Sequence, residues 1–478
     1  MMMHDCCASD ARKASGGYDL AVIGAGSAGF SAAISAAELG AQVALIGNGT
    51  IGGTCVNVGC VPSKTMIRAA EAVHQAETAS RFAGIRAAGG IADWGAVVRQ
   101  KNELVSSLRQ AKYIDLLPSY NTVAYREGRA RLRVDGVTVD GEPIKAGKVI
   151  VATGASPDLP AIPGIETVPY LTSTTALELE ELPKSLLIIG GGYIGCELGQ
   201  MFARAGVDVT IATRRRLLPE AEPEISEALT RYFAEEGITV REGLAYRNIR
   251  QMSEGIALTV SSDGRSETIT AEQVLVTTGR RPNTEGFGLA EAGVELLPNG
   301  GIKVDDRMRT SKAGVYAAGD VTGRDQFVYM AAYGARIAAE NALNGNSKRY
   351  DDTAMPAVVF TDPQVASVGL TEAAARGRGL KVKTSTLKLS YVPRALAARD
   401  TRGLIKLVAE ANSGKLLGAH ILAPEGADSI QTAALAIKCG LSAEQLAETI
   451  FPYLTTVEGL KLAAQTFTKD VAKLSCCA

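Results

Sequence analysis

Residues 18–47 read YDLAVIGAGSAGFSAAISAAELGAQVALIG, and this stretch decides the fold. The apolar run YDLAVIG has the length of a buried strand, and the alanine-rich run after it has the length of a helix. Between them, Gly24, Gly26 and Gly29 form a G-x-G-x-x-G motif. These glycines permit a tight turn, close approach of a pyrophosphate, and close packing of the helix on the strand. The stretch therefore predicts a βαβ unit that binds a dinucleotide.

A second copy of this pattern begins near residue 185, as SLLIIGGGYIGCELGQMFARAG followed by DVTIAT, with its glycines at Gly190, Gly192 and Gly195. Two such units predict an α/β protein with two Rossmann-like dinucleotide-binding domains. From about Met355 the glycine motifs stop and strands alternate with amphipathic helices, which predicts a C-terminal α+β domain. The predicted boundaries are a disordered N-terminus at 1–16, the first domain at 17–182 and 284–352, the second at 183–283, and the last at 353–478.

The composition is that of an ordinary globular protein. Of 478 residues, 46% are apolar and 21% charged, and the formal net charge of −1 argues against nucleic-acid or anionic-membrane partners. The apolar stretches are broken by glycines and the N-terminus lacks a signal-like apolar run, so we expect a cytoplasmic protein. Eight cysteines are too few for a disulfide scaffold, and in a reducing compartment they indicate redox or metal chemistry.

The residues after the second strand of each unit indicate which ligand it binds. Arg214, Arg215 and Arg216 follow VTIAT, and guanidinium groups there suit the 2′-phosphate of NADPH, although a solvated basic turn is the alternative. In the first unit Gly47 follows VALI, where a dinucleotide site carries an acidic residue for the ribose. Another contact must replace that acid, or the affinity is weaker. Gly47→Glu is therefore expected to tighten cofactor binding.

The stretch GGTCVNVGCVPSK, residues 52–64, carries Cys55 and Cys60 ahead of a helix predicted to begin at Pro62. On a straight helix the two residues would be separated by roughly 7.5 Å along the axis, too far for a disulfide, whose Cα atoms lie within about 7 Å. A distorted first turn, which Asn57 and Gly59 permit, would close the gap. A thiol at a helix N-terminus has a lowered pKa and is reactive, and two buried structural cysteines are the alternative. Cys196 and Cys439 are expected to be structural.

With these motifs and VATGASP (151–157), GGGYIGCELG (190–199), TTGRRPNT (277–284) and VYAAGD (315–320), the chain resembles the flavoprotein disulfide reductases from residue 17 onward. The resemblance implies FAD in the first site, NADPH in the second, and a homodimer built by the last domain. It also implies a Cys55–Cys60 disulfide against the flavin, with Cys60 nearest the ring and Cys55 as the exchanging thiol.

The resemblance assigns roles to further residues. Asp320 would contact the ribityl–phosphate region of FAD, Lys64 would lie near the flavin paired with Glu197, and Tyr193 would cover the nicotinamide pocket. The matched motifs imply a wider set of cofactor-binding residues: Gly24, Gly26, Gly29, Gly53, Thr54, Lys64, Thr153, Gly154, Asp320, Gly190, Gly192, Tyr193, Gly195, Arg214, Arg215 and Gly279.

Members of the family that reduce disulfides use a His backed by Glu near the C-terminus as a general acid. This chain has three histidines, His4, His74 and His420, and none lies in FPYLTTVEGLKLAAQTF, residues 451–467. Alignment on Glu458 puts Tyr453 at that position, and a phenol with a pKa of about 10 is a poor proton donor to thiolates. Dihydrolipoamide and glutathione are therefore not the expected substrates.

The chain ends KLSCCA, with Cys476 and Cys477 adjacent, and thiolates are preferred ligands of soft metal ions such as Hg(II). This end resembles the mercuric reductase branch of the family, without its N-terminal metal-binding domain. The resemblance implies reduction of thiol-bound Hg(II) with NADPH at a site shared between subunits. The implied metal ligands are Cys55, Cys60, Cys476 and Cys477, with Tyr113 and Tyr453 beside them.

Two alternatives remain open at this point. One is a thioredoxin reductase-like enzyme that uses the C-terminal pair as a shuttle. The other is a flavoprotein that sequesters the metal without reducing it. Cys6 and Cys7 would form a vestigial thiol site or lie in a disordered terminus.

Overall fold

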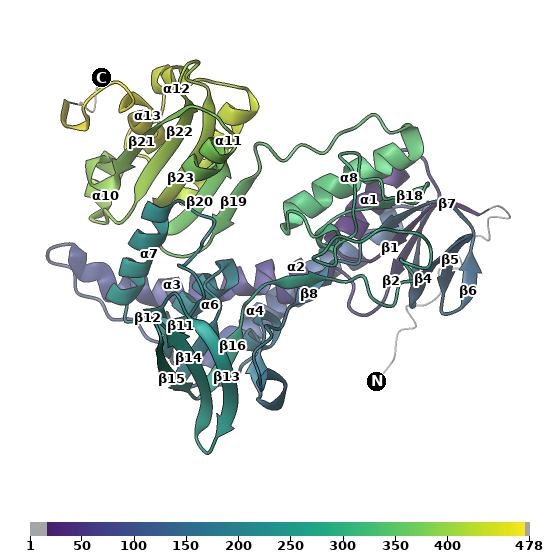
Figure 1. Ribbon diagram of the computed structural model, residues 1–478, viewed down its shortest axis with the longest axis horizontal. Coiled ribbons are helices and arrows are strands. Elements are labelled where there is room, and N and C mark those ends of the chain that lie inside the picture. Colours follow the sequence, from purple (N-terminus) through teal and green to yellow (C-terminus); the bar gives the residue numbers. More distant parts are fainter. Residues whose placement is uncertain (1–16, 474–478) are drawn as a thin grey trace. The chain divides into compact units, whose positions relative to one another are not determined.

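The computed structural model describes residues 17–473, so Cys6, Cys7, Cys476 and Cys477 lie outside the described residues. The chain forms two compact units, each assembled from three segments. The first unit holds the residues up to Pro62, Gln100–Asp158 and Arg280–Tyr350, and the second holds Ser63–Arg99, Leu159–Gly279 and the residues from Asp351 onward (Figure 1). The boundaries between an NADPH-binding and a dimerisation domain stay a prediction.

The first unit is built on a parallel five-stranded sheet in the order β18-β7-β1-β2-β3. Its strands are β1 Tyr18–Ile23, β2 Val43–Gly47, β3 Val123–Glu127, β7 Ala146–Val151 and β18 Val315–Ala317. Helices α1 (Ser27–Glu38) and α8 (Val328–Asn344) pack together on one face (Figure 1). Buried Leu20, Val22 and Leu45 contact these helices, because side chains alternate between the two faces of a strand.

The other face of this sheet packs on smaller strands of the same unit. Buried Ala21, Ile23 and Ile46 join a cluster with Leu132 and Val137. The latter two residues belong to a three-stranded antiparallel sheet of β4 (Ala130–Arg133), β5 (Gly136–Val139) and β6 (Glu142–Ile144). A two-stranded ribbon of β8 (Ala155–Pro157) and β17 (Arg280–Pro282) completes the unit. The first sheet is thus covered on both faces, as a parallel sheet requires.

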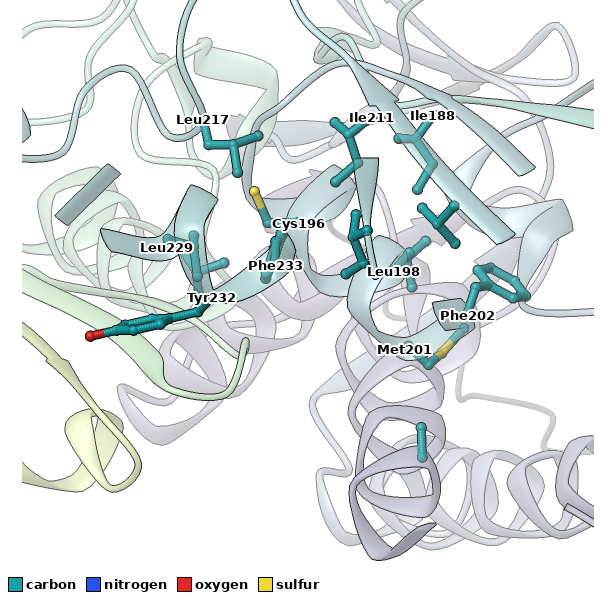
Figure 2. Close-up of a cluster of buried hydrophobic side chains, with 14 of the residues drawn as sticks. Ile188, Cys196, Leu198, Met201, Phe202, Ile211, Leu217, Leu229, Tyr232 and Phe233 are labelled. Carbon is teal, nitrogen blue, oxygen red and sulfur yellow. The ribbon is translucent and has the colours of Figure 1, made fainter. Parts of the chain in front are cut away.

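The second unit repeats the glycine-motif architecture. Its parallel sheet has the order β12-β11-β10-β16-β9, with β9 Tyr170–Leu171, β10 Ser185–Ile189, β11 Asp208–Ala212, β12 Thr239–Arg241 and β16 Gln273–Val276. Helix α6 (Tyr193–Arg204) packs on it, and Cys196, Leu198 and Phe202 of this helix are buried (Figure 2). Strands β13 (Ala245–Met252), β14 (Gly255–Ser262) and β15 (Arg265–Ala271) form an antiparallel sheet beside it.

The C-terminal part of the second unit has its own mixed architecture, as the sequence predicts. Five antiparallel strands lie in the order β19-β20-β23-β22-β21, with β19 Pro356–Val359, β20 Gln364–Gly369, β21 Val382–Lys388, β22 Leu404–Glu410 and β23 Leu416–Ala423. Helices α11 (Gly426–Lys438), α12 (Ala443–Glu448) and α13 (Glu458–Gln465) share their core. No helix within residues 17–473 is long and apolar enough to cross a bilayer.

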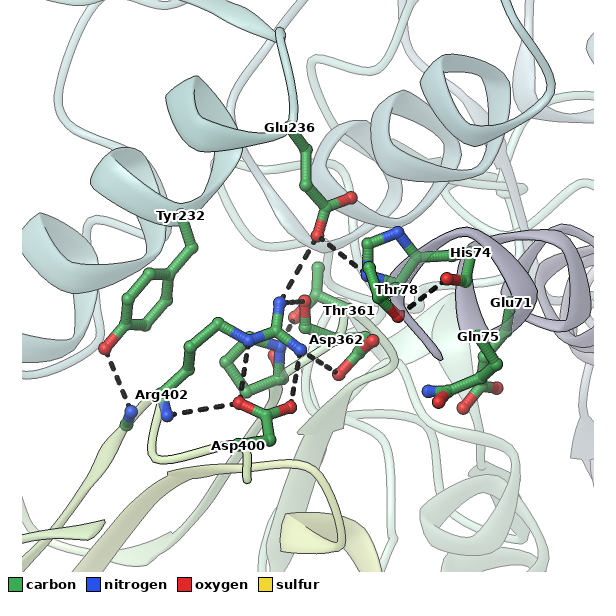
Figure 3. Close-up of polar contacts among 12 residues, drawn as sticks. Glu71, His74, Gln75, Thr78, Tyr232, Glu236, Thr361, Asp362, Asp400 and Arg402 are labelled. Atoms are coloured by element: carbon green, nitrogen blue, oxygen red, sulfur yellow. Dashed lines mark hydrogen bonds and ion pairs between the residues drawn. The ribbon is translucent and has the colours of Figure 1, made fainter. Parts of the chain in front are cut away.

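A network of buried charges ties segments of the second unit together (Figure 3). The Arg402 guanidinium bonds both carboxylate oxygens of Asp400 and reaches Asp362 at 3.2 Å. Glu236, at the end of α7 (Pro223–Glu235), accepts from Arg204 at 2.7 Å. Burial lowers the pKa of His74, whose ring nitrogen lies 3.9 Å from Glu236. Each charge in this network thus has an opposite partner, which offsets the cost of removing it from water.

Candidate active site

The first glycine loop has the geometry that a pyrophosphate needs. Gly24 has a φ of +118°, and a Cβ on Gly29 would stand 1.7 Å from the Gly24 carbonyl oxygen. Gly26 is the N-cap of α1, with extended backbone, so the free N–H groups of the first helical turn face outward from the sheet edge. The helix N-terminus therefore offers an anion-binding position immediately after β1.

The cysteine loop lies directly against this glycine loop. The Gly52 N–H donates to the Ala25 carbonyl at 2.9 Å, and a Cβ on Gly53 would come within 2.6 Å of the Gly26 Cα. Thr54 and Cys55 follow in α2 (Gly53–Val58), within the same unit as Cys60. A ligand bound along the glycine loop is thus bordered by the segment that carries the cysteine pair.

The helix predicted to begin at Pro62 begins earlier, and its distortion lies at Gly59. Cys60 is the first residue of α3 (Cys60–Glu77), and Gly59, with φ −125° and ψ −109°, separates it from α2. A Cβ on Gly59 would lie 3.0 Å from the Thr54 carbonyl oxygen, so this close turn favours glycine. The distortion between the cysteines lies at Gly59, one of the two residues that the sequence indicates for it, whereas the predicted start of the helix at Pro62 is wrong.

Asn57 holds the turn in place. Its amide donates to the carbonyls of Ile51 and Gly53, at 2.9 and 2.8 Å. Arg109, the last residue of α4 (Trp94–Arg109), donates to the Asn57 side-chain oxygen at 3.0 Å. The sequence pattern indicates Asn57 only for its conformational freedom and gives no sign of Arg109, because the two residues are 52 positions apart.

Tyr113 lies next to the cysteine pair. A Cβ on Gly52 would lie 3.3 Å from its ring, which packs edge-on against Phe30 with the ring centroids 4.8 Å apart. Its hydroxyl is 3.5 Å from the Ser27 hydroxyl. Burial raises the pKa of Tyr113, and the charges of Cys55 and Cys60 raise it further. The structure thus brings together Tyr113, Cys55 and Cys60, which are far apart in sequence.

Further predicted residues gather at the carboxyl edge of the first sheet. Thr153 and Gly154 follow β7, and Asp320 follows β18. Thr153 donates to the Asn283 carbonyl at 2.6 Å, which joins the VATGASP and TTGRRPNT motifs. Burial raises the pKa of Asp320, and Arg280, whose Nε is 3.9 Å from the carboxylate, opposes that rise. A half-buried carboxylate at this edge is suited to accept hydrogen bonds from ligand hydroxyls.

At Gly47 the structure contradicts the expectation that glutamate would tighten cofactor binding. A Cβ there would lie 2.6 Å from the Tyr125 hydroxyl and 2.8 Å from the Ala25 Cβ. A side chain at this position collides before it can reach a ligand. A larger residue at position 47 requires Tyr125 and Ala25 to move, so we expect Gly47→Glu to weaken cofactor binding.

The second glycine loop has its own set of ligand-facing residues. Gly190, with φ +117°, follows β10, Gly192 is the N-cap of α6, and Gly279 follows β16. Tyr193 begins α6 and is partly exposed, and partial burial with the Glu220 charge raises its pKa. These residues share one edge of the second sheet.

The three arginines after β11 differ in their contacts. Arg214 lies over the Tyr246 ring, 5.7 Å from its centroid, and Arg215 pairs with exposed Glu220 at 2.9 Å. Arg216 instead donates to the backbone carbonyls of Pro219 and Ala221 and to Ser226. Arg214 and Arg215 remain candidates for a 2′-phosphate, whereas Arg216 holds the turn.

Lys64 and Glu197 form the expected ion pair. The Lys64 ammonium donates to Glu197 at 2.7 Å, and the second carboxylate oxygen accepts from the Phe360 N–H at 2.9 Å. Glu197 is buried, and the ammonium also lies 5.0 Å from the centroid of the Phe360 ring. The pair fixes the lysine side chain one turn beyond Cys60 on α3.

The remaining predicted residues lie apart from these groups. Tyr453 is 53% exposed, in the loop before α13. His420 is buried in β23 with its ring nitrogen 3.0 Å from the Leu370 carbonyl oxygen, and His74 belongs to the charged network. Cys196 is fully buried as expected, but Cys439 is exposed at the end of α11, so packing does not explain it.

The metal-binding prediction depends on residues outside the described part of the chain. Within residues 17–473 no group of three or more His, Cys, Asp or Glu side chains is placed to hold a metal ion. Of the four predicted thiol ligands, Cys55 and Cys60 are described, and Cys476 and Cys477 are not. The complete ligand set stays a prediction.

Comparisons with known proteins define the class. Residues 18–339 match the pyridine nucleotide-disulphide oxidoreductase family, and residues 355–464 match the dimerisation domain of that family. The chain therefore belongs to the pyridine nucleotide-disulphide oxidoreductases. The dimerisation domain indicates a homodimer.

Its similar relatives include mercuric reductases. The chain is 49% identical to the mercuric reductase of Streptomyces lividans, over 97% of this chain and 98% of that protein. It is 48% identical to that of Lysinibacillus sphaericus, over 96% of this chain and 84% of that protein. Among solved structures, the HOCl-induced flavoprotein disulfide reductase RclA of Escherichia coli has a TM-score of 0.83 at 31% identity, covering 95% of this chain and 100% of that chain.

Membership of the family implies FAD and NADPH as cofactors, and the residues present fit both. In the first unit the glycine loop, the α1 N-terminus and Asp320 form a cradle with no side chain in the way at Gly26. In the second unit the glycine loop lies before the N-terminus of α6, and Arg214 and Arg215, which are exposed, follow the second strand. Both sites provide backbone donors for a pyrophosphate.

Proposed function

We propose that the protein is an NADPH-dependent mercury(II) reductase that detoxifies thiol-bound Hg(II). The balanced reaction is NADPH + Hg(II) → NADP⁺ + H⁺ + Hg(0), and FAD held in the first unit would supply the two-electron relay. The observation that carries this proposal is the cysteine pair beside Tyr113, in a chain similar to mercuric reductases over nearly its whole length.

The thiols of Cys55 and Cys60 hold the metal in this proposal. Hg(II) prefers thiolate ligands, and a thiol at a helix N-terminus is more readily deprotonated. Cys60 begins the 18-residue helix α3, whose N-terminal dipole favours its thiolate. We assign Cys60 as the thiol nearest the flavin and Cys55 as the thiol that exchanges ligands with the substrate. In the oxidised protein the two would form a disulfide.

Tyr113 positions the metal, and the Lys64–Glu197 pair serves the flavin. The raised pKa of Tyr113 keeps its hydroxyl protonated, so it can donate a hydrogen bond beside the thiolates. Buried Glu197 accepts from Lys64 and the Phe360 N–H, which holds the ammonium in one orientation. Tyr193 would cover the nicotinamide pocket in the second unit.

The sequence has no histidine in residues 451–467, where family members that reduce disulfides carry one, and this argues against disulfide substrates. Reduction of a disulfide needs a proton donor for the leaving thiolate. Both described histidines have structural partners, and Tyr453 lies in the segment where family members carry the histidine. A metal ion leaves as Hg(0) and needs no such donor.

We further propose that the active sites are shared between subunits. Cys476 and Cys477 would receive Hg(II) from external thiols and pass it to Cys55 and Cys60 of the partner subunit. Tyr453 would contribute from the same subunit as the tail. The family dimerisation domain supports the homodimer that this arrangement requires. We place the enzyme in the cytoplasm, where NADPH and reduced thiols are maintained.

The proposal is tested by NADPH oxidation with Hg(II) in excess thiol, compared with oxidised glutathione and lipoamide. Hg(II) should support turnover at least about a hundredfold faster than either disulfide, as expected for loss of general-acid catalysis. Cys55→Ala and Cys60→Ala should each abolish Hg(II) turnover while FAD stays bound. Cys60→Ala should also remove the long-wavelength absorbance that a thiolate beside the flavin produces. Faster reduction of a disulfide than of Hg(II) would refute the proposal.

Mixed dimers test delivery between subunits. One chain lacks Cys55 and Cys60, and the other lacks Cys476 and Cys477. Delivery across the interface leaves one working site in this heterodimer, whereas delivery within a chain leaves none. An FAD-loaded heterodimer without activity would exclude transfer between subunits and leave the substrate assignment intact.

A further inference from the structure

The first dinucleotide site lacks the acidic residue that holds the adenosine ribose. In such sites an Asp or Glu after the second strand accepts hydrogen bonds from the ribose hydroxyls. Here β2 ends at Gly47, and the adjacent Asn48 is exposed. The ribose hydroxyls of FAD therefore need a partner elsewhere on the chain.

The space beside Gly47 is filled from the neighbouring strand. Tyr125 in β3 places its hydroxyl 2.6 Å from where a Gly47 Cβ would stand. Tyr125 packs in the same cluster as Ala25 of the glycine loop. The phenol thus takes up the room that a β2 side chain needs, and its polar end lies at the edge where the dinucleotide binds.

Glu127 lies beside Gly47 in the register of the sheet. The two residues end β3 and β2 as direct neighbours, and the Gly128 N–H donates to the Gly47 carbonyl at 2.8 Å. Neighbouring strands lie about 4.8 Å apart, a distance that a glutamate side chain spans. Because residues two apart in a strand point to the same face, Glu127 and Tyr125 share the face that α1 covers.

The polar groups of both side chains lack another partner in the described structure. Burial raises the pKa of Tyr125, and the charge of Glu127, two positions further along the same face of β3, raises it further. Among residues 17–473, no group forms a hydrogen bond or ion pair with the Glu127 carboxylate or the Tyr125 hydroxyl. Both polar groups are available to a ligand.

We propose that this chain binds the adenosine ribose of FAD from β3: the Glu127 carboxylate accepts from the ribose hydroxyls, and the Tyr125 hydroxyl makes a second contact. The inference rests on FAD occupying the first site, as the proposed function requires. It moves the ribose anchor by one strand, from β2 to β3, and explains why Gly47 is compatible with FAD binding.

The test is cofactor exchange on the holoenzyme, with FAD competing against an analogue that carries 2′,3′-dideoxyadenosine. The wild type should prefer FAD by about tenfold, the value expected for hydrogen bonds to a charged group. Glu127→Gln should lose most of this preference, and Tyr125→Phe should lose a smaller part. Glu142→Gln, an exposed glutamate on β6, is the matched control and should keep the full preference.

Three outcomes would overturn the proposal. Glu127→Gln could discriminate between the two cofactors as the wild type does. Asn48→Ala could lose the preference instead, which would place the contact after β2. Gly47→Glu could tighten FAD, which would show that the β2 side is open after all. A wild-type protein without FAD would instead refute the proposed function, so the two failures are distinguishable.

Discussion

The two glycine motifs have nearly the same backbone but differ in the residues that come after their second strands. Gly24 and Gly190 have φ values of +118° and +117°, and α1 and α6 each span 12 residues after a glycine N-cap. Strand β2 ends at a position with no room for a side chain, and β11 is succeeded by arginines with exposed guanidinium groups. The matching glycines fit the pyrophosphate that both nucleotides share, while the ends of the second strands are where we predict that the two nucleotides are distinguished.

The largest expected effect is a loss of folding stability when the third glycine of either motif is replaced. Gly29→Ala and Gly195→Ala should each destabilise the protein by about 3 kcal/mol, because a Cβ would lie 1.7 and 2.1 Å from the carbonyl oxygens of Gly24 and Gly190. Gly192→Ala is the control, since its Cβ would meet nothing within 4 Å. Urea unfolding measures the difference. Equal losses at Gly192 and Gly195 would contradict the idea that packing, and not ligand access, requires the third glycine.

The next largest effect is expected on NADPH binding when the arginines after β11 are replaced. Arg214→Ala and Arg215→Ala should each raise the Michaelis constant for NADPH about tenfold and leave that for NADH nearly unchanged, since only NADPH carries the 2′-phosphate. Steady-state kinetics with both cofactors measures this ratio. Arg216→Ala should affect both cofactors alike, because Arg216 bonds backbone carbonyls. If Arg214→Ala and Arg215→Ala also weaken both cofactors equally, the selectivity lies elsewhere.

The smallest expected effect concerns Glu220, which pairs with one of these arginines. Glu220 pairs with Arg215 at 2.9 Å and competes with a 2′-phosphate for the guanidinium. Glu220→Gln should therefore lower the NADPH Michaelis constant about twofold at low salt, and the gain should shrink as salt screens the charges. Both side chains are mostly exposed, which keeps the effect small. A gain that is the same for NADH would show that Glu220 does not act through the 2′-phosphate.

Local sequence patterns predict the elements whose geometry is itself local. The glycine motifs, the reactive cysteine loop and the Lys64–Glu197 pair all derive from short motifs, the last through resemblance to the family. The start of α3 differs from the prediction because Gly59 ends α2 and lets a new helix begin at once.

Contacts between distant segments cannot be read from such patterns. The phenol of Tyr125 fills the space beside Gly47 from a strand that lies nearly eighty positions later. Arg109 fixes Asn57 from the end of another helix. The first contact depends on the pairing of β2 with β3, and the second on the end of α4 lying beside α2. The sequence shows that the acidic residue is missing at Gly47. It does not show that a side chain placed there would meet Tyr125 and Ala25.

Trp94 is the single tryptophan of the chain, so intrinsic fluorescence reports on one known position. Its indole is buried in the core of the second unit, donates to the Leu179 carbonyl at 2.9 Å and packs near Phe202. Intrinsic tryptophan emission therefore follows the melting of this unit, while flavin emission follows cofactor release from the first. Two superimposable denaturation curves would show that both units unfold as one cooperative system, and separated curves would give the stability of each.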